Sequence, residues 1–195
     1  MNITYLADVQ RTAWLNGGGF KRDLLKTDGV LVSVADITRD GPFSFYDDRQ
    51  RFFAVLNGAG VLLGNPAVSL TTQSPVHEFA GEDAPECHLI NGETLDLNLM
   101  VKRSRIGGNL VRLPNVSSSH LCEFEASASP GMFGVFVMGS TILTKLDSSE
   151  LHEHVLSLPC LVWQPISTSK VRWALKSSEP NEYLNAFSFY CKSRI

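Results

Sequence analysis

The stretch from residue 41 to residue 60, GPFSFYDDRQRFFAVLNGAG, constrains the fold most strongly. It begins with a Gly-Pro turn signal and closes near Asn57-Gly58, a dipeptide typical of tight hairpins. Between these turns, residues 51–56 form a short apolar run rich in aromatic side chains, which predicts a buried strand rather than a helix. We expect residues 61–63 to return after the turn as its partner strand.

Similar short segments recur along the whole chain, separated by turn residues. The clearest is residues 95–100, in which leucines alternate with polar residues. Others are residues 30–35, 68–72, 121–124, 134–137, 141–146, 161–164, 171–175 and 186–191. Only residues 20–25 and 148–154 show helical periodicity, each over one or two turns. This pattern predicts an all-β sandwich or barrel.

Length and composition limit the domain organisation and the partners. A chain of 195 residues fits one large domain or two small ones. The polar stretch 103–109 predicts a boundary, which would give units 1–105 and 106–195. The net charge is −3 and there is no basic run, so no nucleic-acid partner is expected.

The chain also lacks the usual signals for membranes and secretion. No apolar run approaches the roughly 20 residues that a membrane helix needs, and residues 1–8 do not resemble a signal peptide. The four cysteines are widely spaced, without a Cys-x-x-Cys pair. We therefore expect a cytoplasmic protein with reduced thiols and no membrane contact.

An ordered set of motifs in the N-terminal half resembles the HutD/Ves family of bacterial proteins. The set comprises residues 14–19 (WLNGGG), 32–36 (VSVAD), 41–44 (GPFS), 51–60 with Arg51 and LxGxG, and 79–100 with FAGE and DLNLM. The resemblance implies a cupin-like fold, that is, an RmlC-like jelly roll or double-stranded β-helix. It implies two barrel units in one chain, a bicupin. It also implies a non-catalytic binder of small molecules, linked to histidine utilisation or to stress response.

The stretch 41–60 also resembles the first signature of metal-binding cupins, but the ligand positions differ. Asp47 and Arg49 stand at the two histidine positions and Phe53 at the glutamate position. In the second signature, the histidine position holds Ala84. One carboxylate is too few for a transition metal, which normally has three or more protein ligands. We expect no metal and no cofactor.

The motifs supply the candidate ligand-binding residues. Asn16 and Gly17 could bring backbone N–H groups close to an anion, and the alternative is a simple turn after Trp14. Ser33 and Ser44 could offer hydroxyl groups at the barrel interior and mouth. Arg51 would favour a carboxylate ligand through paired hydrogen bonds.

Asp96 and Asn98 complete the set, because they share one face of their strand. A buried aspartate needs a partner, and Arg51 is the natural one, either at a binding site or in a purely structural pair. The leading hypothesis is thus a sensor of a small carboxylate. One alternative is a metal-independent isomerase or epimerase using His88 and Asp96. Another is a structural protein whose barrels form a homodimer.

Overall fold

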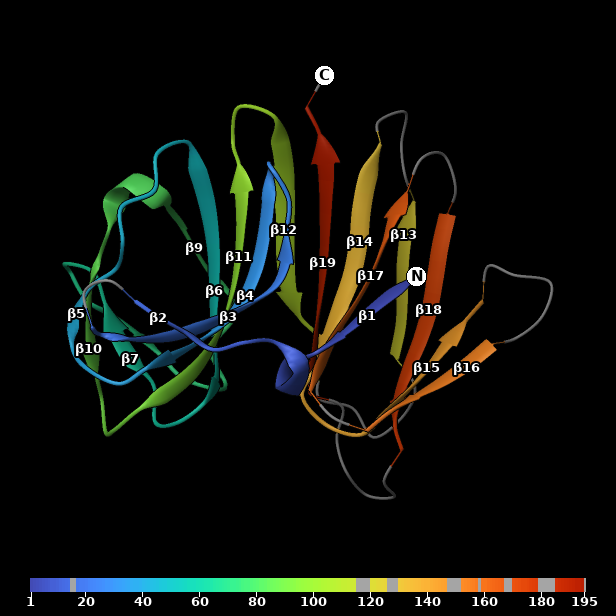
Figure 1. Cartoon of the computed structure of the whole chain (residues 1–195), viewed down its shortest axis with the longest axis horizontal. Coiled ribbons are helices and arrows are strands. Elements are labelled where there is room, and N and C mark those ends of the chain that lie inside the picture. Colours follow the sequence, from blue (N-terminus) through green and yellow to red (C-terminus); the bar gives the residue numbers. More distant parts are fainter. Residues whose placement is uncertain are drawn as a thin grey trace. The chain divides into compact units, whose positions relative to one another are not determined.

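The computed structural model describes residues 1–14, 17–114, 120–125, 130–146, 152–157, 159–166, 170–178 and 185–194. Its regular structure is β-strand apart from two short 3-10 turns (Figure 1), so the expected all-β class is confirmed. The chain divides into two compact units. The N-terminal unit is Val9–Gly107, and the C-terminal unit combines Met1–Asp8 with Gly108–Ile195. Within the described residues, no helix is long and apolar enough to cross a membrane.

Two sheets build the N-terminal unit. The larger has the order β2-β3-β4-β11-β6-β9, with β2 (Thr12–Ala13), β3 (Gly19–Lys26), β4 (Val30–Ile37), β11 (Thr94–Lys102), β6 (Arg49–Asn57) and β9 (His77–Ala80). The smaller has the order β5-β10-β7-β8, with β5 (Gly41–Pro42), β10 (Glu86–Leu89), β7 (Val61–Leu63) and β8 (Val68–Leu70). The 3-10 turn η2 (Gly81–Asp83) follows β9. Val55 of the larger sheet packs in one apolar core with Val61, Leu63 and Cys87 of the smaller sheet.

Strand β11 lies at the centre of the larger sheet and is buried on both faces. It pairs antiparallel with β4 and β6, which places Asn98 opposite Ser33 on one side and opposite Phe53 on the other. Leu97 and Leu99, on the other face, have no exposed surface. The alternation in residues 95–100 therefore separates two buried faces, and the polar one belongs to the barrel interior.

The hairpin expected at Asn57-Gly58 is wrong. Strand β6 pairs with β11 and β9, whereas residues 61–63 form β7 in the other sheet, between β10 and β8. The turn instead carries the chain from one sheet to the other. Gly60 has a φ of +116°, and a Cβ there would lie 2.2 Å from the carbonyl oxygen of Leu70. Glycine is required because the crossing brings two backbone segments together.

The C-terminal unit also contains two sheets. One has the order β1-β17-β14-β19-β12, with β1 (Asn2–Tyr5), β17 (Cys160–Ile166), β14 (Gly131–Val137), β19 (Ala186–Ser193) and β12 (Ile106–Arg112). The other has the order β13-β18-β15-β16, with β13 (His120–Glu125), β18 (Lys170–Ser177), β15 (Thr141–Lys145) and β16 (His152–Leu156). The 3-10 turn η1 (Leu6–Asp8) follows β1.

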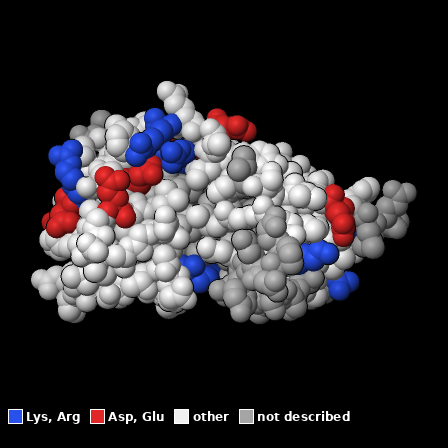
Figure 2. All heavy atoms as spheres, turned by 90° about the horizontal axis from the view of Figure 1, so that it is seen from below, with Lys and Arg blue, Asp and Glu red and all other residues white. Residues whose placement is uncertain are grey.

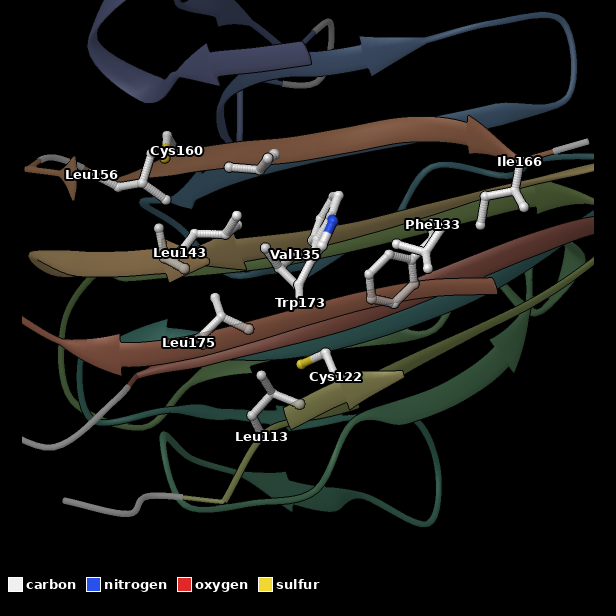
Figure 3. Close-up of a cluster of buried hydrophobic side chains, with 14 residues drawn as sticks. Leu113, Cys122, Phe133, Val135, Leu143, Leu156, Cys160, Ile166, Trp173 and Leu175 are labelled. Carbon is white, nitrogen blue, oxygen red and sulfur yellow. The ribbon is translucent and has the colours of Figure 1, made fainter. Parts of the chain in front are cut away.

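Apolar side chains fill the interior of the C-terminal unit. Figure 3 shows Trp173, Phe133, Val135 and Leu143 in this cluster, which draws on strands of both sheets. The rings of Phe133 and Trp173 meet edge to face, with centroids 4.9 Å apart. Trp173 is fully buried. Packing of this kind stabilises the unit through burial of apolar surface.

The helical turns expected at residues 20–25 and 148–154 are not found in the described residues. Residues 20–25 belong to β3 and residues 152–154 to β16, while residues 148–151 lie outside the described part of the chain. In β3, a register shift between Asp23 and Leu25 disturbs the strict alternation that would mark a strand. This bulge explains why the sequence pattern was ambiguous.

Charged side chains at the surface of the N-terminal unit form pairs of opposite sign. Arg103 pairs with Glu82, and Arg105 pairs with Asp28 at 2.7 Å. On the face in Figure 2, basic and acidic side chains likewise lie beside one another. Because each positive charge lies next to a negative one, the pairs produce little net electrostatic field at longer distances.

Candidate functional site

A cavity of about 420 Å³ opens into the N-terminal unit, a volume typical of small-molecule sites. Its wall is formed by strands of the larger sheet and by the loop between β5 and β6. The lining residues are Thr12, Ala13, Trp14, Lys21, Ser33, Ala35, Ile37, Phe43, Ser44, Tyr46, Arg51, Asn98 and Met100. Seven of these thirteen residues are apolar or aromatic and six are polar or charged, so the polar groups would determine how a ligand is oriented.

Arg51 of β6 is the most distinctive of the polar groups. Its side chain is buried, and the whole residue is 5% exposed. Nη2 donates a hydrogen bond to Oδ1 of Asn98 at 3.1 Å, and Nη1 donates to the carbonyl oxygen of Ser44 at 3.4 Å. Nε is buried and has no hydrogen-bond partner among the described residues. No described carboxylate lies within ion-pair distance of this guanidinium.

Aromatic rings surround the guanidinium carbon of Arg51. The ring centroids of Phe43 and Phe79 each lie 4.8 Å from it, and that of Tyr46 lies 5.6 Å away. Burial lowers the pKa of Arg51 to about 10, which leaves it protonated at neutral pH. The rings stabilise the cation through their π faces and exclude water from it. A buried positive charge thus faces the cavity, supported mainly by neutral groups.

Four of the seven predicted site residues meet at this cavity: Ser33, Ser44, Arg51 and Asn98. Gly17 is not part of the lining. Its N–H donates to the carbonyl oxygen of Trp14, and its own carbonyl oxygen accepts a bond from Arg39, as in a turn. Asn16 lies outside the described residues.

Asp96 is also absent from the lining, and its expected pairing with Arg51 is wrong. Met100 is the residue of β11 that lies opposite Arg51, so Asp96 is four positions further along the strand. Asp96 is fully buried, and its Oδ2 accepts a 2.7 Å hydrogen bond from the hydroxyl of Thr94. Burial raises the pKa of Asp96 well above its ordinary value, and the negative charge of Asp36 adds to the shift. The amide of Asn98, rather than a carboxylate, supports Arg51.

Sequence reasoning missed Lys21, Tyr46 and Trp14 as lining residues. Lys21 lies on β3, and its Nζ pairs with Oδ2 of Asp23 at 3.0 Å. Trp14 is partly buried against the core of the unit, beside β2. Reading residues 19–26 as a strand would have placed Lys21 and Asp23 on one face, because side chains two apart in a strand point the same way.

Comparison of the chain with known proteins identifies its family. A model of the HutD family matches residues 6–180, which is most of the chain. The chain belongs to the HutD family. An uncharacterised 21.2 kDa protein from the hutC 3′ region of Pseudomonas putida is 33% identical over 113 residues. That match spans 53% of this chain and 59% of the relative.

Solved structures show that the HutD family fold is that of the cupins. A conserved protein of unknown function from Pseudomonas aeruginosa PAO1 superposes with a TM-score of 0.86 at 22% identity, covering 100% of this chain and 99% of that one. HutD from Pseudomonas fluorescens SBW25, in a formate condition, gives 0.73 at 21% identity with the same coverage. Oxalate decarboxylase from Bacillus subtilis gives 0.65 at 6% identity, over 96% of this chain and 75% of that one. The predicted two-barrel cupin fold is confirmed.

The cupin metal positions of this HutD family member do not fit a metal ion. Phe53 has no donor atom and is fully buried in the core, and Ala84 has no donor side chain. Arg49 is cationic, and its Nη1 donates to the carbonyl oxygen of Gly29. Only Asp47 could offer a carboxylate. Among the described residues, no group of three or more His, Cys, Asp or Glu side chains could hold a metal ion.

The acid–base pair considered for a HutD-family enzyme does not assemble either. His88 is exposed, and its Nδ1 lies 3.0 Å from Oδ2 of Asp40 at the surface. Hydrogen bonds from the Leu89 amide and from His88 lower the pKa of Asp40. Asp96 is buried and bonds to Thr94. The two residues therefore have separate partners in separate environments.

Proposed function

We propose that this HutD-family protein binds a small carboxylate in the cavity of its N-terminal unit and releases it unchanged. The observation that carries the proposal is Arg51, a buried guanidinium at the cavity with no acidic partner among the described residues. A buried charge is costly unless it is paired. A ligand carboxylate would supply the missing negative charge.

The surroundings of Arg51 suit an anion of this kind. Guanidinium and carboxylate groups match in geometry, since two parallel N–H groups can meet two oxygens. Nε of Arg51 has no described partner and is free to donate. The side chains of Ser33 and Asn98 add neutral polar groups to the same wall. The rings of Phe43 and Phe79 cover the guanidinium and strengthen its electrostatic attraction by keeping water away.

The relatives support a proposal for the biological role. One solved relative is HutD itself, and the Pseudomonas putida relative lies beside hutC. We infer that the ligand is a small carboxylate from amino-acid breakdown. In this role the protein acts as a sensor in histidine utilisation, and its occupancy reports the concentration of that carboxylate.

Isothermal titration calorimetry with straight-chain mono- and dicarboxylates, from formate to adipate, tests the proposal. At least one should bind the wild-type protein, and Arg51→Met should weaken that binding by about tenfold or more, because a charge-assisted hydrogen bond is lost. Arg51→Lys should give an intermediate affinity, since an ammonium cannot pair with both oxygens in the same plane.

Arg105→Met is the matched control. Arg105 lies in the same unit but is exposed and paired with Asp28. Its replacement should leave the affinity unchanged. The melting temperature of each variant shows whether it is folded. Failure of every carboxylate to bind the wild-type protein, or full affinity in folded Arg51→Met, would refute the proposal.

A further inference from the structure

A band of polar side chains crosses the inner wall of the larger sheet. Asp23 of β3 lies opposite Ser33 of β4, and Ser33 lies opposite Asn98 of β11. Asn98 in turn accepts the hydrogen bond from Arg51 of β6. The band therefore runs over four neighbouring strands, from a carboxylate at one end to a guanidinium at the other.

Both ends of this band carry an unused hydrogen-bonding group. At one end, Nε of Arg51 is a buried donor without a described partner. At the other, Oδ2 of Asp23 accepts from Lys21, while Oδ1 is buried and accepts nothing from the described residues. Buried polar atoms in proteins almost always have partners. The two atoms are complementary in kind, because one needs an acceptor and the other a donor.

The direction of the Asp23 side chain is fixed by its strand. Lys21 and Ser33 line the cavity. Asp23 is not itself part of that lining, but it lies opposite Ser33 and shares a face with Lys21, which places it next to the lining. The ion pair between Lys21 and Asp23 agrees with this placement. The register shift that follows Asp23 is a bulge of the kind that re-aims side chains next to binding sites. Lys21 occupies one oxygen of the Asp23 carboxylate, and the other has no partner among the described residues.

We propose that the cavity selects a carboxylate that also carries an N–H donor, either an ammonium group or an amide. The acid group binds Arg51, and the N–H donates to Oδ1 of Asp23. This inference rests on the carboxylate-binding function proposed above and narrows its ligand class. It assigns to Asp23 the role of a specificity-determining residue.

The length of the band sets the length of the ligand. Nη2 of Arg51 bonds to Asn98, so the guanidinium lies beside the β11 position of the band. Asp23 and Asn98 are two strand spacings apart, which is roughly 10 Å of backbone separation. Both side chains extend inward and shorten this gap. The acid and the N–H must therefore stand several bonds apart. Glycine is too short, and affinity should rise along the series β-alanine, 4-aminobutyrate and 5-aminopentanoate.

Calorimetry with three matched ligands tests the inference: pentanoate, 5-aminopentanoate and N-acetyl-5-aminopentanoate. At least one of the two N–H ligands should bind the wild-type protein about tenfold or more tightly than pentanoate, because a hydrogen bond to a charged acceptor is gained. A gain for 5-aminopentanoate would indicate an ammonium ligand, and a gain for N-acetyl-5-aminopentanoate would indicate an amide ligand. In Asp23→Ala, that N–H ligand and pentanoate should bind with about the same affinity, so the ratio of their affinities should fall to about one.

Asp28→Ala is the control, since Asp28 lies in the same unit with an 80% exposed side chain. It should keep the wild-type ratio. Equal affinities for all three ligands in the wild-type protein, or an unchanged ratio in Asp23→Ala, would overturn the inference and leave carboxylate binding intact. If no carboxylate binds, the proposed function fails and this inference fails with it.

Discussion

Asp96 gives the sharpest test of the energetics of this barrel. Its carboxyl group is fully buried, and Thr94 is its one hydrogen-bond partner among the described residues. Burial raises its pKa well above the ordinary value of about 4. The folded state thus holds a proton that the unfolded chain releases as the pH rises above that value. The free energy of unfolding must therefore fall as the pH rises through this window.

The substitution Asp96→Asn removes this pH dependence. At pH values between the pKa of Asp96 in the unfolded chain and its pKa in the folded protein, the wild-type protein should lose about 1.4 kcal/mol of stability per pH unit. The Asp96→Asn variant should lose none from this site. Near pH 4 the variant should be less stable by about 1–3 kcal/mol, because an amide N–H replaces the unpartnered Oδ1. The free energy of unfolding of the variant should exceed that of the wild-type protein from about one to two pH units above this point.

Urea unfolding followed by circular dichroism, from about pH 4 to about pH 8, measures both stabilities. The quantity of interest is the difference between variant and wild type, in which all other titrations cancel. Asp28→Asn, which makes the same change at an exposed position of the same unit, is the comparison variant. If the curves for Asp96→Asn and wild type run parallel, then Asp96 titrates alike in both states and the reasoning is refuted.

Two further predictions concern glycine and cysteine. Gly60→Ala should lower the melting temperature far more than Gly92→Ala. Both glycines have positive φ, but only at Gly60 would a new Cβ meet the backbone, 2.2 Å from an oxygen. Equal shifts of the two melting temperatures in differential scanning fluorimetry would contradict this. All four cysteines are free and buried, and burial raises the pKa of each thiol to about 12. The native protein should therefore react with Ellman's reagent at pH 8 only as fast as it unfolds, and rapid labelling without denaturant would argue against buried thiols.

Much of the candidate site followed from local pattern and family motif. The alternation in residues 95–100 put Asn98 and Asp96 on one face, and the family motif in residues 51–60 singled out Arg51. Ser33 and Ser44 came from motifs in the same way. All but Asp96 line one cavity. Such inferences hold because the two-residue period of a strand is a local property of the backbone.

The failures arose where two distant segments had to be aligned. The sequence could not tell that Arg51 lies opposite Met100, and hence within reach of Asn98 rather than Asp96. Nor could it tell that the strand after Gly58 joins a different sheet. Lys21 and Asp23 were missed for a related reason, because a bulge blurred the alternation of β3.

The amino-acid sequence by itself determined the strand-rich character, the family and the residues that carry unusual chemistry. These depend on side-chain type and on spacing within short segments. Only the tertiary structure decided which of those residues face the same cavity and which partners they have. Strand register joins residues that are tens of positions apart, and shifting it by one residue would turn every side chain of a strand to the opposite face. That choice is made by the packing of the whole barrel, which no single segment encodes.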